Sequence, residues 1–70
     1  MKRRDVIKRI AKQAKADDVD FDLKREGARH SVYDCGGIMI PIPRHNEIDD
    51  RTAEGIFKEC EPALGKDWWR

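Results

Sequence analysis

The stretch HSVYDCGGIMIPI, residues 30–42, decides the fold. Its centre is the pair Gly36-Gly37, with apolar and β-branched residues on both sides. A glycine pair accepts the positive φ angles that a two-residue hairpin turn requires. We therefore predict two antiparallel strands, over residues 29–35 and 38–42, joined by this turn.

The turn also determines which residues lie opposite one another. The predicted pairs are Cys35 with Ile38, Tyr33 with Ile40, Ser31 with Ile42, and His30 with Pro43. Opposed residues in an antiparallel pair point to the same side of the sheet. Ser31, Tyr33 and Cys35 should therefore share the face of the isoleucines, which we expect to form the core. His30 and Val32 should lie on the open face.

The strand before this hairpin is predicted over residues 19–25, where apolar and charged residues alternate. A three-residue loop over residues 26–28 directs its apolar side chains to the core, whereas a two-residue loop would direct them to solvent. The pairs that follow are Val19 with Cys35, Phe21 with Tyr33, Leu23 with Ser31, Arg25 with Arg29, and Lys24 with His30. Because Pro41 has no N–H, the third strand, residues 38–42, should be an edge.

Apolar residues at helical spacing predict helices over residues 3–16 and 50–61. The two stripes are Val6, Ile7, Ile10, Ala11 and Ala14, and Ala53, Ile56, Phe57 and Cys60. Asp49 or Asp50 should cap the second helix, and Pro62 should end it.

The order is therefore helix, three strands, helix. We predict an α+β fold, αβββα, in which two helices cover one face of a three-stranded antiparallel sheet. Residues 1–70 should form one domain, with a core over about 3–64 and a tail at 65–70.

Composition limits the classes of function. The chain has 15 Lys and Arg against 14 Asp and Glu, so any basic surface must be local. One such surface is the polar side of the first helix, which is either a solvated face or a patch for phosphate or a partner. Its cations are Arg4, Lys8, Arg9, Lys12 and Lys15.

The isolated Cys35 and Cys60 suit a reducing compartment, where each would fill the core as a small apolar residue, although a disulfide between them is an alternative. No apolar run suggests a signal peptide or membrane span, so we expect a cytoplasmic protein.

His30 is the candidate for chemistry, because histidine can move a proton near neutral pH. Lys24 is predicted beside it, and Arg25, Arg29 and Arg44 are predicted at the same end of the sheet. His45 lies two residues beyond Pro43. Imidazoles among cations suit phosphodiester cleavage, although His30 is equally readable as an ordinary exposed strand residue. The two histidines lack suitably spaced ligand partners, so we predict no metal and no cofactor.

Four segments in order resemble the HicA family, the small mRNA-cleaving toxins of bacterial type II toxin–antitoxin pairs. They are RRDVIKRI (3–10), EGARHSVY (26–33), IPRH with the following EI (42–48), and RTAEGIFK (51–58). The family patterns that they resemble are S-x-x-V/I-I-K-x-L, K-G-S/G-H-x-x-Y/F, V-P-x-H and G-T-L-x-x-I-L-K. The chain departs from them at Ala28-Arg29, where the family has small residues, and at Arg51 and Ala53.

The resemblance implies a fold like that of a double-stranded RNA-binding domain and an mRNA substrate. It also implies a catalytic role for His30, and a HicB-type antitoxin partner on the face of Lys24, His30 and Val32.

Two other functions remain open. One is an RNA-binding module without catalysis. The other is an interaction domain anchored by Trp68 and Trp69, which alternatively pack against the second helix.

Overall fold

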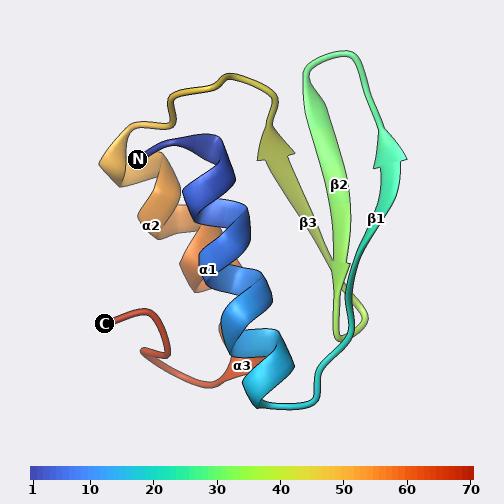
Figure 1. Ribbon diagram of the computed structural model, residues 1–70, viewed down its shortest axis with the longest axis vertical. Helices are drawn as coiled ribbons and strands as arrows, with labels where there is room; N and C mark the ends of the chain where they lie inside the picture. The colour runs from blue at the N-terminus through green and yellow to red at the C-terminus, as the bar shows by residue number, and fades with distance from the viewer.

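Three antiparallel strands form one layer of the molecule and the helices form the other (Figure 1). The computed structural model describes residues 1–70. Its elements are α1 (Arg3–Ala16), β1 (Phe21–Glu26), β2 (His30–Cys35), β3 (Ile38–Pro43), α2 (Asp50–Glu59) and α3 (Glu61–Leu64). The predicted α+β class and αβββα order are confirmed, and the short α3 is an addition to them. No helix is long and apolar enough to cross a membrane.

The β2–β3 hairpin has the register that the glycine pair predicted. Cys35 lies opposite Ile38, and His30 lies opposite Pro43 at the far end of the ladder. Gly36 and Gly37 have φ angles of 58° and 93°, and positive values at both central residues are those of a type I′ turn. The sheet order is β1-β2-β3, so β3 is an edge strand.

The predicted register of β1 is wrong by two residues at Phe21 and Leu23 and by three residues at Arg25. Phe21 lies opposite Cys35 and Leu23 opposite Tyr33, rather than Tyr33 and Ser31. The loop between the strands consists of residues 27–29, not 26–28, because Glu26 still belongs to the strand. A bulge between Leu23 and Arg25 then reduces the offset from three residues to two. Because two is an even number, Phe21 and Leu23 keep the face of the sheet that was predicted for them.

The start of β1 was also predicted too early, because Val19 belongs to the end of α1. The N–H of Val19 donates to the carbonyl of Ala14 at 2.8 Å, and the N–H of Asp18 donates to that of Lys15 at 3.3 Å. These two bonds form a Schellman motif, which requires a left-handed residue after the helix. Asp18 occupies that position with a φ of 56°.

Asp18 gives the first testable prediction. Replacing Asp18 with Gly should raise the midpoint of thermal unfolding, because glycine adopts this φ without the steric cost of a Cβ. The matched control is Asp17→Gly, which removes the same charge where φ is −94°. There the glycine should lower the midpoint through its greater backbone entropy and through loss of the hydrogen bond that the Asp17 carboxylate accepts from Gln13. Equal shifts in both variants would mean that charge, not φ, decides the outcome.

The core lies between the helices and the inner face of the sheet. Its twelve buried hydrophobic residues are Val6, Ile10, Ala14, Cys35, Ile40, Ile42, Ile48, Ala53, Ile56, Phe57, Cys60 and Leu64. Two residues of the predicted apolar set are exposed: Ala11, and Leu23 on the edge strand with 47% of its surface accessible. The others that lie outside these twelve are partly buried and pack against them. Ser31 is the one buried polar residue.

The second helix begins and ends by identifiable contacts. The carboxylate of Asp49 accepts the N–H of Thr52 at 2.7 Å, which makes Asp49 the cap. This backbone hydrogen bond lowers the pKa of Asp49. α2 ends at Glu59, and Pro62 lies in the first turn of α3, where a missing N–H costs nothing.

The C-terminal tail packs against α2. The indole N–H of Trp68 donates to the carbonyl of Phe57 at 2.9 Å, and that of Trp69 donates to Glu61 at 2.9 Å. Both rings contact the Phe57 ring, with centroids 5.3 Å and 6.2 Å away. The guanidinium of Arg9 covers the same ring at 5.2 Å. Residues 65–70 are therefore part of the fold.

Both cysteines are free, buried thiols. Burial raises the pKa of Cys60 from its ordinary value of 9.0 to about 12, and the neighbouring Cys35 adds to the effect. Burial likewise raises the pKa of Cys35. Their place in the core agrees with the predicted role of small apolar fillers.

This raised pKa predicts a stability loss at high pH. Below pH 9.0 the Cys60 thiol is protonated in both states, and above it the unfolded chain releases the proton first. The free energy of unfolding should therefore fall from pH 9.0 toward 12. Urea titrations across this range should show a smaller fall in Cys60→Ala than in the parent. Equal falls would contradict the assignment to this thiol.

Candidate functional site

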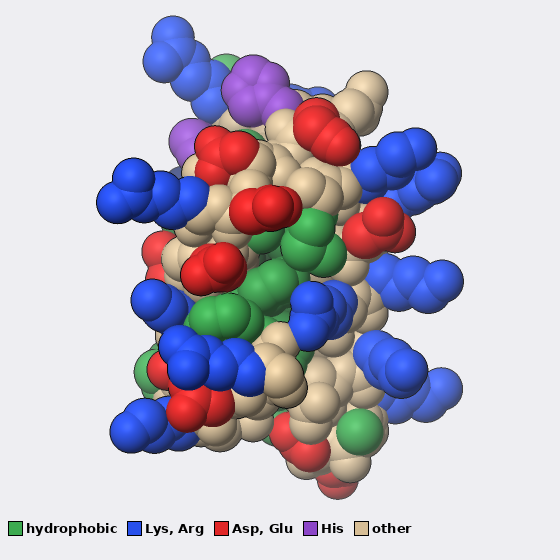
Figure 2. All heavy atoms as spheres, turned by 90° about the vertical axis from the view of Figure 1, so that its left-hand side faces the viewer, with side chains coloured by type: hydrophobic (Ala, Val, Ile, Leu, Met, Phe, Trp, Pro, Cys, Tyr) green, Lys and Arg blue, Asp and Glu red, His purple; other side chains and the backbone are tan.

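Two Arg-His dipeptides lie side by side at one end of the sheet. Arg29-His30 leads into β2, and Arg44-His45 follows β3. The N–H of Arg44 donates to the carbonyl of Arg29 at 3.1 Å, which continues the ladder one step beyond the pairing of His30 with Pro43. Figure 2 shows histidine side chains at the same, upper end of the molecule. Antiparallel pairing thus brings the two histidine-bearing segments together from positions far apart in the sequence.

A hollow lies between these segments. Its lining consists of Ala28, Arg29, Arg44 and His45. The guanidinium of Arg44 donates to the carbonyl of Gly27 at 2.8 Å, so this side chain is oriented along the β1–β2 loop. The loop itself is tight, because a Cβ on Gly27 would lie 2.9 Å from the carbonyl oxygen of His30. Three of the predicted site residues therefore share one surface feature.

His30 directly follows Arg29 in the chain but does not line this hollow, and it lies on the uncovered face of the sheet. It is the first residue of β2, is exposed, and alternates with the buried Ser31. Val32 lies two residues along on the same face and is half-buried. The uncovered face is therefore where a substrate or a protein partner could reach His30.

His45 lies where β3 ends and the approach to α2 begins. Besides the hollow with the arginines, it lines a second depression together with Asp49 and Thr52. Neither His45 nor His30 makes a side-chain hydrogen bond or an ion pair within the chain. Both imidazoles therefore keep their nitrogen atoms for contacts outside the chain.

The prediction that Lys24 lies across from His30 is wrong. Lys24 sits at the bulge, and its ammonium lies 3.8 Å from the carboxylate of Asp34. Asp34 is four residues along β2 from His30, a distance of roughly 13 Å at strand spacing. Arg25 lies opposite Val32 and is also farther along the sheet than predicted. Of the predicted cations, Arg29 and Arg44 are therefore the two that remain next to the histidines, as their neighbours in the chain.

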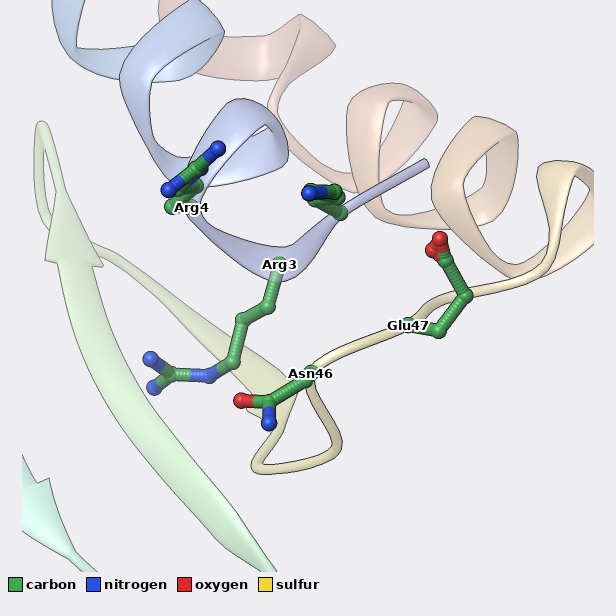
Figure 3. A pocket seen from close by; sticks show the side chains of 5 residues that line it. Arg3, Arg4, Asn46 and Glu47 are labelled. Atoms are coloured by element: carbon green, nitrogen blue, oxygen red, sulfur yellow. The ribbon is translucent and has the colours of Figure 1, made fainter.

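Arg3 is a residue of this region that the sequence analysis missed. Its Nε donates to the carbonyl of Pro43 at 2.9 Å, and its Nη2 donates to the hydroxyl of Ser31 at 2.8 Å. The Ser31 hydroxyl donates in turn to the carboxylate of Glu26. Figure 3 shows the Arg3 side chain extending from the helix toward the sheet, beside Asn46. One guanidinium thus joins α1 to the end of β3 and the start of β2.

The sequence did carry a signal for Arg3. It precedes Val6 and Ile7 by three and four residues, so it falls on the apolar side of α1 rather than among the exposed cations. A cation in that position must reach a polar partner inside the fold. Ser31, predicted to face the core, was the matching partner.

Comparison of the chain with protein-family models, curated proteins and solved structures finds no match in any of the three. The structure contains no group of three or more His, Cys, Asp or Glu side chains placed to hold a metal ion.

The Arg3 contacts predict a stability difference between two adjacent arginines. Arg3→Met should lower the free energy of unfolding by about 2 kcal/mol, because it removes two charge-assisted hydrogen bonds at a partly buried site. Arg4→Met removes the same charge from an exposed position and should change it by less than about 0.5 kcal/mol. Urea unfolding followed by tryptophan fluorescence measures both. A similar cost for the two variants would contradict the role of the buried contacts.

Proposed function

We propose that the protein is a metal-independent endoribonuclease of the HicA toxin class, with His30 at its catalytic centre. The observation that carries the proposal is the pairing of Arg29-His30 with Arg44-His45 at one end of the sheet. The pairing brings two proton-transfer groups, His30 and His45, and two arginines, Arg29 and Arg44, to the same end of the sheet. The order of motifs along the chain supports the same class.

The reaction is an attack by a ribose 2′-hydroxyl on the adjacent phosphorus. A general base removes the proton from the 2′-oxygen as the new P–O bond forms. The bond from phosphorus to the 5′-oxygen breaks, and a general acid protonates that oxygen. The products are a 2′,3′-cyclic phosphate and a free 5′-hydroxyl. No electrons are exchanged with a third reactant, so side chains suffice.

The two proton transfers require two groups, because one imidazole cannot take and give a proton in the same step. His30 serves as one of them and His45 as the other. The exposed position of each imidazole, without an intramolecular partner, supports these roles. Arg29 and Arg44 would contact the phosphate and stabilise the charge that develops on its oxygens. Arg44 retains donors for this after its bond to Gly27, since a guanidinium has five N–H groups.

A toxin of this class requires an antitoxin partner, and a HicB-type protein is the one that the resemblance implies. Its contact surface would be the uncovered face that carries His30 and Val32. Exposed Met39 and Pro41 on the same face extend the surface that a partner can bury. Lys24 lies farther from His30 than the sequence suggested and would mark the rim of that contact. Such a pair would act in the cytoplasm, on mRNA.

The test is cleavage of an RNA oligomer in the presence of EDTA. The parent protein should yield the cyclic-phosphate product, and His30→Asn should lose about 10²-fold or more in rate, as expected for a general acid or base. His45→Asn should lose activity in the same way. Lys58→Gln, on the exposed side of α2, is the control and should retain the parent rate.

Three results would contradict the proposal. One is an unchanged rate in His30→Asn with the parent's circular dichroism spectrum. Another is cleavage of the same oligomer built of deoxyribose, which has no 2′-hydroxyl. The third is RNA binding by the parent without any cleavage, which would identify an RNA-binding module instead.

A further inference from the structure

Four cations form one row along the solvent side of α1. They are Arg4, Lys8, Lys12 and Lys15, and all four are exposed. Successive members are three or four residues apart, so they follow one another at about 5–6 Å along the helix axis. We call this set the α1 row.

The α1 row has no partner within the chain. The three ion pairs of the structure join Met1 to Asp50, Lys24 to Asp34 and Arg70 to Asp67. Arg9, the remaining exposed cation of α1, is occupied by the tail: its guanidinium donates to the carbonyl of Trp69 and covers Phe57. Asp5 is the only carboxylate of the helix. The row is therefore a surface of uncompensated positive charge.

The position of the α1 row connects it to the histidine end of the sheet. Its first member, Arg4, lines a pocket with Lys2, Arg3, Asn46 and Glu47. Figure 3 shows this pocket between the start of α1 and the loop that carries Asn46. Asn46 directly follows His45 in the chain, so the row starts next to the candidate active site. Figure 2 shows Lys and Arg side chains one below another along the right-hand edge of the molecule, below the end that carries the histidines.

Acidic residues mark the other limits of the row. Beyond Lys15 the chain turns through Asp17, Asp18 and Asp20, all of them exposed. On the α2 side, Asp49, Asp50 and Glu54 are exposed as well. The near-zero net charge of the chain thus conceals a local excess of positive charge: a polyanion is attracted along α1 and repelled at its far end. α2 carries exposed charges of both signs, since Arg51 and Lys58 lie there as well.

We propose that the α1 row binds the phosphate backbone of single-stranded RNA that extends from the histidine site. The spacing of the cations suits successive phosphates of one extended strand. A duplex presents two rows of phosphates across a groove, whereas α1 offers a single row. The row contains no aromatic side chain on which bases could stack. Its binding should therefore depend on the charge of the phosphates and show no preference for base sequence.

The location of the cleaved bond in this path rests on the proposed function, but the binding does not. A strand with its reacting phosphate at Arg29 and Arg44 would continue past Arg4 toward Lys15. The distal cations, Lys12 and Lys15, should then matter only for strands long enough to reach them. Short substrates should depend on the histidine end alone.

Salt dependence of binding tests the α1 row. The probe is a fluorescent oligouridine with 2′-O-methyl riboses, which binds but cannot be cleaved through its blocked 2′-oxygen. In the variant Lys8→Gln/Lys12→Gln, the slope of log affinity against log salt should become shallower by about 1.4, or 0.7 for each lost phosphate contact. The control Arg51→Gln/Lys58→Gln removes the same charge from α2 and should keep the parent slope. Equal changes in both variants would overturn the proposal, because net charge alone would then explain them.

Two further comparisons vary the length of the probe and its chemical type. Lys12→Gln/Lys15→Gln should weaken binding of the long oligouridine and leave binding of a uridine dinucleotide unchanged. Equal weakening of both would overturn the path. Stronger binding of duplex RNA than of the single strand through the same lysines would overturn the single-strand assignment. Competition by polyglutamate as effective as that by RNA would identify a surface for an acidic protein instead.

The RNA path and the catalytic proposal fail in different ways. If the salt dependence of binding differs as expected between the two variants but no RNA is cleaved, RNA binding along the α1 row is supported and the ribonuclease proposal fails. If RNA is cleaved through His30 but the α1 variants bind like the parent, the path fails and the ribonuclease stands.

Discussion

The hydroxyl of Ser31 has no access to water, so it needs hydrogen-bond partners inside the fold. The contacts at this end of the sheet supply them. A buried hydroxyl without partners would cost the fold about 1–3 kcal/mol. The carboxylate of Glu26 and the guanidinium of Arg3 supply those partners. Because Arg3 also binds the carbonyl of Pro43, one network joins β1, β2, β3 and α1. That network lies directly beneath the residues that carry the candidate chemistry, His30 on β2 and the segment after β3.

Much of the fold followed from local rules that the sequence states clearly. The Gly36-Gly37 turn is so restrictive that it determined every pair between β2 and β3. The register of β1 was less accessible, because the loop over residues 27–29 permits more than one geometry. The hydrophobic pattern argued for placing Leu23 on the core, yet the helices do not cover that end of the edge strand. The pairing next to the loop, Glu26 with Ser31, moved Lys24 and Arg25 along the sheet away from the histidines.

The candidate site was predictable to the extent that it depends on β2 and β3. Arg29, Arg44 and His45 come together because the predicted ladder continues past His30 and Pro43. Lys24 was misplaced because its position depended on the uncertain β1 register. Arg3 was missed because α1 carries five other cations, and only its position three and four residues before Val6 and Ile7 distinguishes it from them. A cation on the apolar side of α1 and a serine facing the core are each unusual alone, and together they indicate a contact.

The prolines of β3 have a consequence for how this protein can meet other chains. In the β2–β3 ladder, Ile38, Ile40 and Ile42 direct their backbone groups toward β2, so those of Met39, Pro41 and Pro43 face outward. Two of these three residues have no N–H, and the carbonyl of Pro43 is already taken by Arg3. The opposite edge is interrupted by the bulge in β1. Neither edge therefore offers a regular template for strand addition, which guards the molecule against edge-to-edge aggregation. Recognition by another protein has to proceed through side chains on the faces of the molecule.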